Sequence, residues 1–435
     1  MKRSTIKSII INSLLWLSLG TVFFSCTKDF GNLNSPTVES FLGNASKSDL
    51  NNLVSGTESG MRTSVAFYLD DVSTIGREGY HFSASEPRYV TDLLGADAAT
   101  LSNSNFYITT PWASAYRVVK NCNLLIQAAS NSTLISDAEK SGYYGFARTI
   151  KAYQLLLNYN LTDTIRLDVN DPDHLGPKVG HAAALTGILA ILDSGKNDLS
   201  NASVVFPLSS GFNGFNDAAG LTRFNRALAA RVDAYLANWP DVLTALSESF
   251  FSLTGDFYLG VNHAFSTGTG DQLNPMFFPQ NQTGEVRVAH PSYAADIVAG
   301  DDRISKATLR LATASLLGLS SNRDVWVYTS STGPVPIIRN EELILLYAEA
   351  NIQNSNLPEG EKALNVIRNG HHLSNYSGPV TKDDLINEML YERRYSLFYE
   401  GHRWIDLRRY NRLNDLPLDR TGDDIWSIFP LPVSE

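Results

Sequence analysis

Apolar side chains recur every three or four positions along much of this chain, which is the period of one face of an α-helix. The pattern covers residues 49–69, 111–129, 139–158 and 185–199. Pro111 suits the first turn of its helix, where the backbone N–H groups have no partner within the helix. Cys122 falls on the apolar face, so we interpret it as a small core residue rather than a nucleophile.

Two further segments have the pattern of paired helices. Residues 222–250 contain two helical stretches with a break at 238–240, and residues 339–369 contain two with a break at 354–358. Alanines at positions of close approach, and a large aromatic residue in the first helix of each pair, resemble tetratricopeptide-type hairpins. The sequence therefore predicts a mostly α-helical scaffold of such hairpins, with long irregular loops and little β structure. A scaffold of this kind carries out no reaction by itself.

Residues 255–335 interrupt this regular pattern. The stretch up to residue 302 is rich in Gly, Asn, Pro, Phe and Tyr, and alternation in residues 325–328 predicts a short strand. Loops of this length in a compact domain usually carry function, and the many aromatic residues argue against disorder. We therefore expect a loop-rich insert with a functional role.

The first 25 residues have the features of a signal peptide. Basic residues precede an apolar stretch that is too short for a membrane span. The small residue before Cys26 resembles a bacterial lipobox, in which the cysteine is acylated, although Phe23 stands where leucine is usual. The alternative is an ordinary secretory signal that is cleaved nearby. Acylation, for example by palmitate, would make residues 26–48 a lipidated tether and residues 49–435 a single anchored domain.

Composition excludes several classes of partner and site. The 435 residues carry a formal net charge of -10 and include two cysteines. An acidic chain without basic clusters argues against nucleic acid and against a polybasic membrane patch. Two cysteines cannot build a disulfide framework or a cysteine-rich zinc site.

Residues 381–412 predict a helix corner that ion pairs hold together. Thr381 is a suitable N-cap, and Gly401 a suitable helix end. Two arginines interrupt the apolar face of the helix, and buried guanidinium groups need partners. The predicted structural network consists of Glu392, Arg393, Arg394, Glu400, Arg403 and Asp406. We favour this interpretation over catalysis, because structural ion pairs often imitate active sites.

The same segment resembles the C-terminal signature of the SusD/RagB family. These are outer-membrane lipoproteins of Bacteroidota that bind nutrients, usually glycans, beside a TonB-dependent transporter. The signature positions are Glu392, Arg393, Phe398, Glu400, Gly401, Arg403, Asp406, Leu407 and Arg409. Further matches occur in order at residues 112–124, 146–156, 301–303, 336–350, 364–368 and 429–432. The resemblance implies a SusC-like β-barrel partner, an oligosaccharide or other nutrient as ligand, and a lipid-anchored position facing the exterior of the outer membrane.

The sequence favours no enzyme. A glycosidase needs two positioned carboxylates, and no pair stands out from the surface acids. There is no phosphate-binding loop, nucleophile elbow or His-Glu-x-x-His helix. His371 and His372 are adjacent and would point in different directions from a helix, so we expect no metal site and no cofactor.

Sugar binding needs aromatic faces for the apolar side of a ring and polar groups for its hydroxyls. The loop regions supply both, and the candidate ligand-binding residues are Arg77, Tyr80, Phe82, Arg88, Tyr89, Phe277, Phe278, Gln280, Trp326 and Tyr328. Each of these could instead serve the core or a contact with the transporter. The alternative function is a scaffold that binds peptide or protein. An exposed row of aromatic side chains would favour sugar, and a continuous apolar groove would favour peptide.

Overall fold

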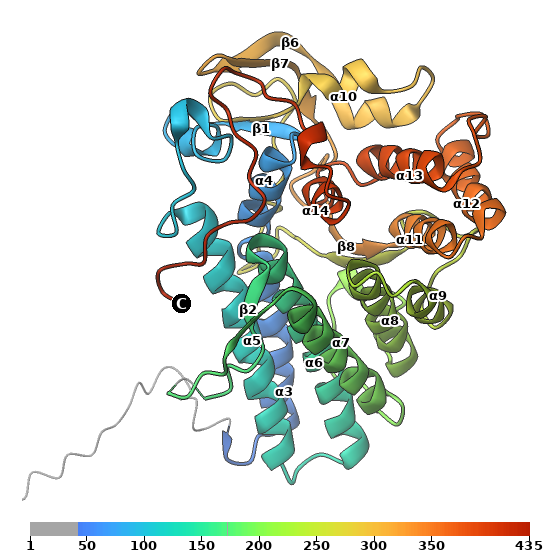
Figure 1. The fold of residues 1–435 in the computed structure, drawn as a ribbon. Helices are drawn as coiled ribbons and strands as arrows, with labels where there is room; N and C mark the ends of the chain where they lie inside the picture. Colours follow the sequence, from blue (N-terminus) through green and yellow to red (C-terminus); the bar gives the residue numbers. More distant parts are fainter. Residues whose placement is uncertain (1–41, 172) are drawn as a thin grey trace, which may run out of the picture. The chain divides into compact units, whose positions relative to one another are not determined.

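The predicted helices of the N-terminal half pack side by side in the computed structural model, which describes residues 42–171 and 173–435. The predicted signal peptide, Cys26 and most of the predicted tether lie outside the described residues. The helices are α3 (Lys47–Arg62), α4 (Val65–Ile75), α5 (Phe106–Asn131), α6 (Asp137–Thr162), α7 (His181–Leu199), α8 (Ala218–Tyr235) and α9 (Trp239–Ser247). Helix α6 packs between α5 and α7, α3 lies against α5, and α8 continues the layer from α7 to α9 (Figure 1).

The single helix predicted for residues 49–69 is wrong, because the chain forms two helices there. Helix α3 ends at Arg62, and Ser64 adopts a non-helical backbone before α4 begins. Helix α3 buries one face, whereas nearly every residue of α4 is buried. The one-sided pattern of α3 cannot continue into α4, because α4 is buried on nearly all sides. The helix therefore breaks between the two.

The C-terminal part of the chain contains four further α-helices. They are α11 (Asn340–Gln353), α12 (Leu357–Gly370), α13 (Lys382–Ser396) and α14 (Arg403–Arg409). Leu345, Leu364 and Met389 belong to a small separate core that α11, α12 and α13 share. The predicted pairs are confirmed, because α8 packs on α9 and α11 packs on α12. A short helix α10 (Pro291–Asp296) and five 3₁₀ turns complete the set: η1 (Pro87–Tyr89), η2 (Ala96–Ala98), η3 (Ser210–Phe212), η4 (Asp302–Lys306) and η5 (Leu413–Asp415).

Three small antiparallel sheets accompany the helices. The largest has the strand order β1 (Gly79–Phe82), β5 (Val286–Ala289), β7 (Leu319–Val325), β6 (Ala307–Leu316). The two-stranded sheets pair β2 (Thr164–Arg166) with β3 (Lys178–Gly180), and β4 (Gly260–His263) with β8 (Val335–Arg339). The prediction of a mostly α-helical fold with little β structure is confirmed.

The strand predicted for residues 325–328 is wrong except at its first residue. Strand β7 ends at Val325, and the following residues run on without a strand partner. Trp326 still donates its backbone N–H to the Lys306 carbonyl at 2.7 Å. The alternation seen in the sequence therefore reflects one buried and one half-buried aromatic residue rather than a ladder of hydrogen bonds.

Cys122 lies in the main core, as expected from its place on the helical pattern. Its side chain is fully buried, and burial raises the pKa of its thiol to about 12. A thiol that stays protonated is a poor nucleophile. None of the helices within the described ranges is long and apolar enough to cross a membrane.

Helix α6 offers a direct test of local stability, because a capping box starts it. Ser136 accepts a hydrogen bond from the Glu139 N–H at 3.3 Å, and Glu139 accepts one from the Ser136 N–H at 2.7 Å. We expect Ser136→Ala to lower the free energy of unfolding by about 1 kcal/mol, measured by urea unfolding. Ser194→Ala is the matched control. Its hydroxyl donates only to the Ala190 carbonyl at an exposed position of α7, where alanine is the better helix former. Equal losses in both variants would contradict the prediction.

Candidate ligand-binding site

A surface cavity of about 520 Å³ lies beside the β4–β8 sheet. Its walls come from four separate stretches: the residues before and within β4, the end of η4, the chain from the end of β7 through β8, and the turn after α13. The lining residues are Tyr258, Asn262, Ser305, Lys306, Trp326, Val327, Tyr328, Thr329, Gly333, Pro334, Pro336, Arg339 and Glu400. This volume is in the range of sites that hold small organic ligands.

The sheet brings these stretches together through a close strand contact. Gly260 pairs with Arg339, and a side chain at Gly260 would lie 2.2 Å from the Ile338 carbonyl oxygen. Glycine therefore allows β4 to approach β8 at this point. Asn262 pairs with Pro336 after a shift in register, and Pro336 has no N–H to donate to the ladder. The ladder continues for only one more pair, His263 with Val335, so the sheet stays short.

Two aromatic residues give the cavity its apolar surfaces. Tyr258 is 65% exposed, and its ring lies 5.5 Å from the guanidinium carbon of Arg339. Trp326 is half-buried, and its ring centre lies 6.2 Å from that of Phe277. Aromatic rings with an open face can pack against the apolar face of a ligand.

A charged group lies at the base of the cavity. Arg339 donates to both carboxylate oxygens of Glu400, at 2.9 and 3.0 Å, and also to Glu341. Burial alone would lower the pKa of Arg339, but these two carboxylates raise it well above its usual value. Lys306 donates to the backbone carbonyl of Tyr395 at 3.1 Å, and burial lowers its pKa to about 8. The base therefore offers fixed hydrogen-bonding groups with balanced charge.

Glu400 is positioned by an unusual turn. Tyr399 has a φ of 60°, which is rare for a bulky residue, and Gly401 has a φ of 85°. Three hydrogen bonds hold Tyr399 in this conformation: its N–H donates to Glu78, its hydroxyl donates to Asp70, and its carbonyl accepts from Tyr328. The helix end predicted at Gly401 is wrong, because α13 already ends at Ser396, although Gly401 does adopt the left-handed conformation. Backbone strain of this kind persists only where the surroundings enforce it.

Five of the ten predicted ligand-binding residues are buried. Arg77, Tyr80, Phe82, Tyr89 and Tyr328 are each at most 7% exposed. Arg77 donates to the backbone carbonyls of Ile75 and Asp424, and the hydroxyl of Tyr328 donates to Tyr399. The hydrogen-bonding groups of Arg77 and Tyr328 are thus occupied within the core, and a ligand-binding role for these five residues stays a prediction. Tyr328 contributes only to the inner wall of the cavity.

The other five predicted residues lie in different places. Trp326 lines the cavity, and Phe277 packs beside Trp326 without lining the cavity itself. Phe278 lies against Arg287, with 4.4 Å between its ring centre and the guanidinium carbon. Gln280 donates to the Thr308 side chain at 2.9 Å, and Arg88 pairs with Glu86 beside η1. Neither Phe278, Gln280 nor Arg88 lines the cavity, so their role as ligand-binding residues stays a prediction.

Sequence reasoning missed Tyr258 and Lys306. Tyr258 stands in an irregular stretch, where no periodicity separates an exposed aromatic residue from a core one. Lys306 is the last residue of η4. Its side chain lies at the cavity because η4 packs near α13, and this contact joins distant parts of the sequence. Arg339 carried a signal as part of the family pattern, but its sequence neighbours do not reveal its partner Glu400.

The signature segment is rich in ion pairs, although most partners come from other parts of the chain. Arg393 pairs with Asp406 at 2.7 Å. Arg394 reaches Asp296 at 2.9 Å, and Glu392 reaches Arg303 at 2.7 Å. Further pairs join Glu400 to Arg339 and Arg409 to both Asp406 and Glu349.

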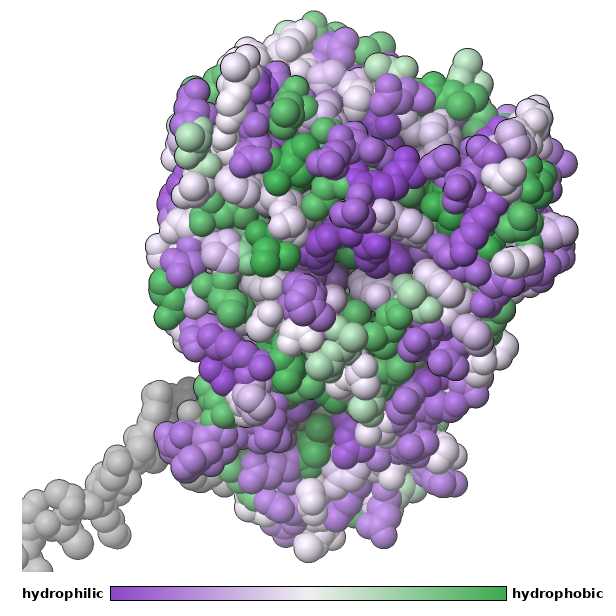
Figure 2. Space-filling view, viewed as in Figure 1, coloured by the Kyte–Doolittle hydropathy of each residue, from purple (hydrophilic) through white to green (hydrophobic). Residues whose placement is uncertain are grey.

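Arg403 is the exception in this segment. Its Nε donates to the Gly76 carbonyl at 3.1 Å, and it has no ion pair with any acid in the described part of the chain. Burial, and then the nearby Arg394, lower the pKa of Arg403 to about 10. Strongly hydrophilic residues gather on the surface between α13 and α14, where Arg394, Arg403 and Arg412 line a shallow groove (Figure 2).

The architecture is similar to that of known proteins. A sequence model described as the SusD family matches residues 299–424. No curated protein matches the chain. A SusD superfamily protein from Bacteroides vulgatus superposes with a TM-score of 0.66 at 16% identity, over 89% of this chain and 96% of the other.

Two solved structures with functional names share the fold. NanU from B. fragilis has a TM-score of 0.66 at 14% identity, over 93% of this chain and 97% of its own. Surface glycan-binding protein A from Bacteroides uniformis has a TM-score of 0.63 at 14% identity, over 85% and 89%. The sequence match across the signature segment, together with the SusD superfamily fold along most of the chain, confirms the SusD/RagB resemblance.

Proposed function

We propose that this protein captures an oligosaccharide, without chemical reaction, in the cavity beside the β4–β8 sheet. The observation that carries the proposal is the pairing of Trp326 and the exposed Tyr258 with fixed charged groups at the base of one cavity. The name of one protein with this fold, a surface glycan-binding protein, supports the same ligand class.

The geometry suits a sugar for physical reasons. The apolar face of a pyranose ring packs on an aromatic ring, while its hydroxyls both donate and accept hydrogen bonds. In the cavity, Glu400 has lone pairs beyond those that Arg339 occupies, and Lys306 has one ammonium donor beyond the two that bond the Tyr395 and Ser396 carbonyls. Because Arg339 and Glu400 hold each other in place, little side-chain order has to be created when the ligand binds.

The cellular setting belongs to the same proposal. Acylation at Cys26 would tether the domain to the outer membrane, facing the exterior. The bound nutrient would pass to a SusC-like TonB-dependent barrel, with this protein acting as a receptor that closes over the barrel. The signal-like N-terminus and the SusD/RagB resemblance support this arrangement.

Binding of the full-length protein to a panel of polysaccharides and peptides tests the proposal. We expect saturable binding to a glycan, measured by calorimetry. Trp326→Ala and Tyr258→Ala should each weaken it about tenfold or more, which corresponds to about 1.4 kcal/mol. The reason is that each variant removes a surface on which the sugar packs.

Tyr376→Ala is the matched control, because Tyr376 is a half-buried aromatic residue at the edge of the α11–α13 core and lies outside the cavity. Its affinity should equal that of the unaltered protein. Peptide binding without glycan binding would contradict the proposal and favour the scaffold alternative. An equal loss in Tyr376→Ala and the cavity variants would show that the site lies elsewhere.

A further inference from the structure

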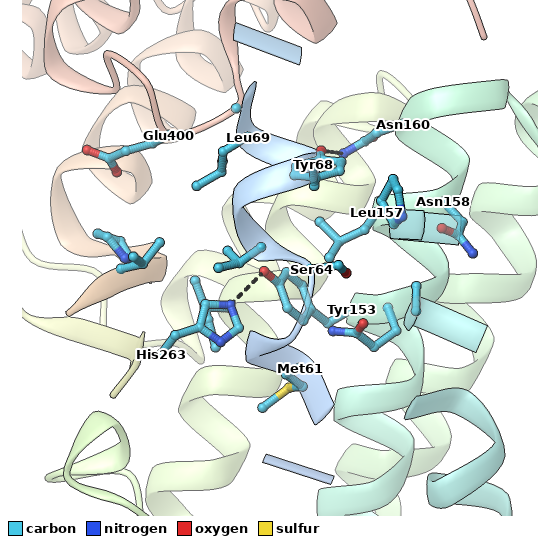
Figure 3. A pocket seen from close by; sticks show the side chains of 18 of the residues that line it. Met61, Ser64, Tyr68, Leu69, Tyr153, Leu157, Asn158, Asn160, His263 and Glu400 are labelled. Carbon is cyan, nitrogen blue, oxygen red and sulfur yellow. Dashed lines mark hydrogen bonds between the residues drawn. The ribbon is translucent and has the colours of Figure 1, made fainter. Parts of the chain in front are cut away.

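A second, much smaller cavity lies inside the protein, between α4, α6 and β8 (Figure 3). Its volume is about 40 Å³, and most of the side chains around it are buried. Figure 3 shows Tyr68 and Asn160 on one side of this space, and Tyr153 and His263 on another. Helices that pack this closely usually leave no space larger than a water molecule, and the few spaces that remain are apolar or hydrated.

Five buried polar atoms on its lining residues lack a hydrogen-bond partner within residues 42–171 and 173–435. They are Gln154 Nε2, Asn158 Oδ1, Asn160 Oδ1, His263 Nδ1 and His402 Nδ1. Each of these side chains is at most 8% exposed. Native proteins leave few buried polar atoms without a partner, so five around one cavity call for a ligand that satisfies them.

The two asparagines are oriented by their other contacts. The Asn158 amide donates to the Trp112 carbonyl at 3.2 Å, and the Asn160 amide donates to the Tyr68 hydroxyl at 2.9 Å. Their carbonyl oxygens therefore remain as acceptors, while Gln154 Nε2 remains as a donor. The cavity thus presents both kinds of group at once.

The two histidines fit the same requirement. Burial lowers the pKa of His263 to about 3 and that of His402 to about 4, so both rings are neutral near pH 7. A neutral imidazole donates from one nitrogen and accepts at the other. A cation would not suit the Gln154 N–H, and an anion would not suit the two amide oxygens. A ligand that both donates and accepts is required.

We propose that this cavity is a buried binding site for a cluster of about three ordered water molecules, each needing about 10–15 Å³ of such space. The waters bridge the amides of α6 to the imidazoles of His263 and His402. They therefore join α6 to β4 and to the turn before α14 through hydrogen bonds that no direct contact provides. Glu400 and Pro336 line both this cavity and the surface cavity, so the waters lie directly behind the wall of the latter. The site does not depend on the proposed glycan binding.

A high-resolution crystal structure of the full-length protein tests the proposal directly. We expect at least two water peaks within hydrogen-bond distance of the Asn158 and Asn160 amide oxygens and the two ring nitrogens. The same structure of Gln154→Met should lose the water nearest residue 154 and keep the others. Empty density in the cavity would overturn the proposal. So would rotamers that pair the five atoms with one another.

Thermal unfolding gives a second, independent measurement. In a dry cavity, Gln154→Met removes a buried polar group without a partner, which stabilises the protein. In a hydrated cavity, it removes a hydrogen bond to water instead. We therefore expect a melting temperature no higher than that of Gln127→Met, the matched change at an exposed position on α5. A melting temperature clearly above that of Gln127→Met would overturn the proposal.

Discussion

Replacing Arg231 with methionine should lower the free energy of unfolding by about 3–5 kcal/mol. Arg231 is 5% exposed and donates to both carboxylate oxygens of Glu342, each at 2.6 Å. It also donates to the Ile337 carbonyl at 2.8 Å, which ties α8 to the edge of β8. Burial alone would raise the pKa of Glu342, but Arg231, followed by His402, lowers it to about 2. Methionine fills similar space, so the loss comes mainly from leaving a buried carboxylate without its partner.

Urea unfolding at neutral pH measures this effect. Lys196→Met is the matched control, because Lys196 pairs with Glu248 on the surface, where each side chain is more than a third exposed. An exposed pair contributes about 0–1 kcal/mol. Similar losses in the two variants would show that the buried pair does not stabilise the junction of α8, β8 and α11.

Replacing Glu78 with glutamine should make the protein more stable above neutral pH and should flatten its pH dependence. Glu78 is 3% exposed, and burial raises its pKa from 4.5 to about 7. In the unfolded chain the carboxyl loses its proton near pH 4.5, but in the folded protein it does so near pH 7. The folded state therefore holds more protons between these values, and stability falls as the pH rises through this window.

The rise in the pKa of Glu78 corresponds to about 3 kcal/mol at pH values well above 7. Glutamine does not ionise and can still accept the hydrogen bond from the Tyr399 N–H, which is 3.1 Å long in the unaltered protein. We expect a gain of less than about 1 kcal/mol for the variant at about pH 5, and a gain of up to about 3 kcal/mol at about pH 8. Urea unfolding across this range measures it.

Two comparisons make the pH experiment specific. Glu248→Gln changes an exposed carboxylate and should leave the pH dependence almost unaltered. Some dependence should remain in Glu78→Gln, because burial also raises the pKa of Asp233 to about 7. A Glu78→Gln curve parallel to that of the unaltered protein would refute the role given to Glu78.

The helices could be predicted from the sequence because their signal is local. In α5 one face carries the core residues, and the spacing of those residues alone identifies the helix. The break between α3 and α4 was missed, because a fully buried helix such as α4 has no polar face to mark its limits. The strand at residues 325–328 was wrong, because alternation can come from packing as well as from a ladder.

The site could be predicted only in part, because its residues meet through long-range contacts. Trp326 was identified by residue type, but so were Tyr80 and Phe82, which stack on each other in the core with ring centres 5.4 Å apart. Residue type alone does not distinguish an aromatic residue that lines the cavity from one that packs in the core. Likewise, the need for partners of Arg393 and Glu400 could be predicted, whereas the pairing of Glu400 with Arg339 depends on the meeting of β8 and the turn after α13.

A crystal structure of the full-length protein with a bound oligosaccharide tests the central claim most directly. The account predicts a sugar ring against the face of Trp326 or Tyr258, with hydroxyls within hydrogen-bond distance of Lys306 or Glu400. A sugar bound away from the β4–β8 cavity, for example in the arginine-lined groove between α13 and α14, would contradict the site proposed for this protein.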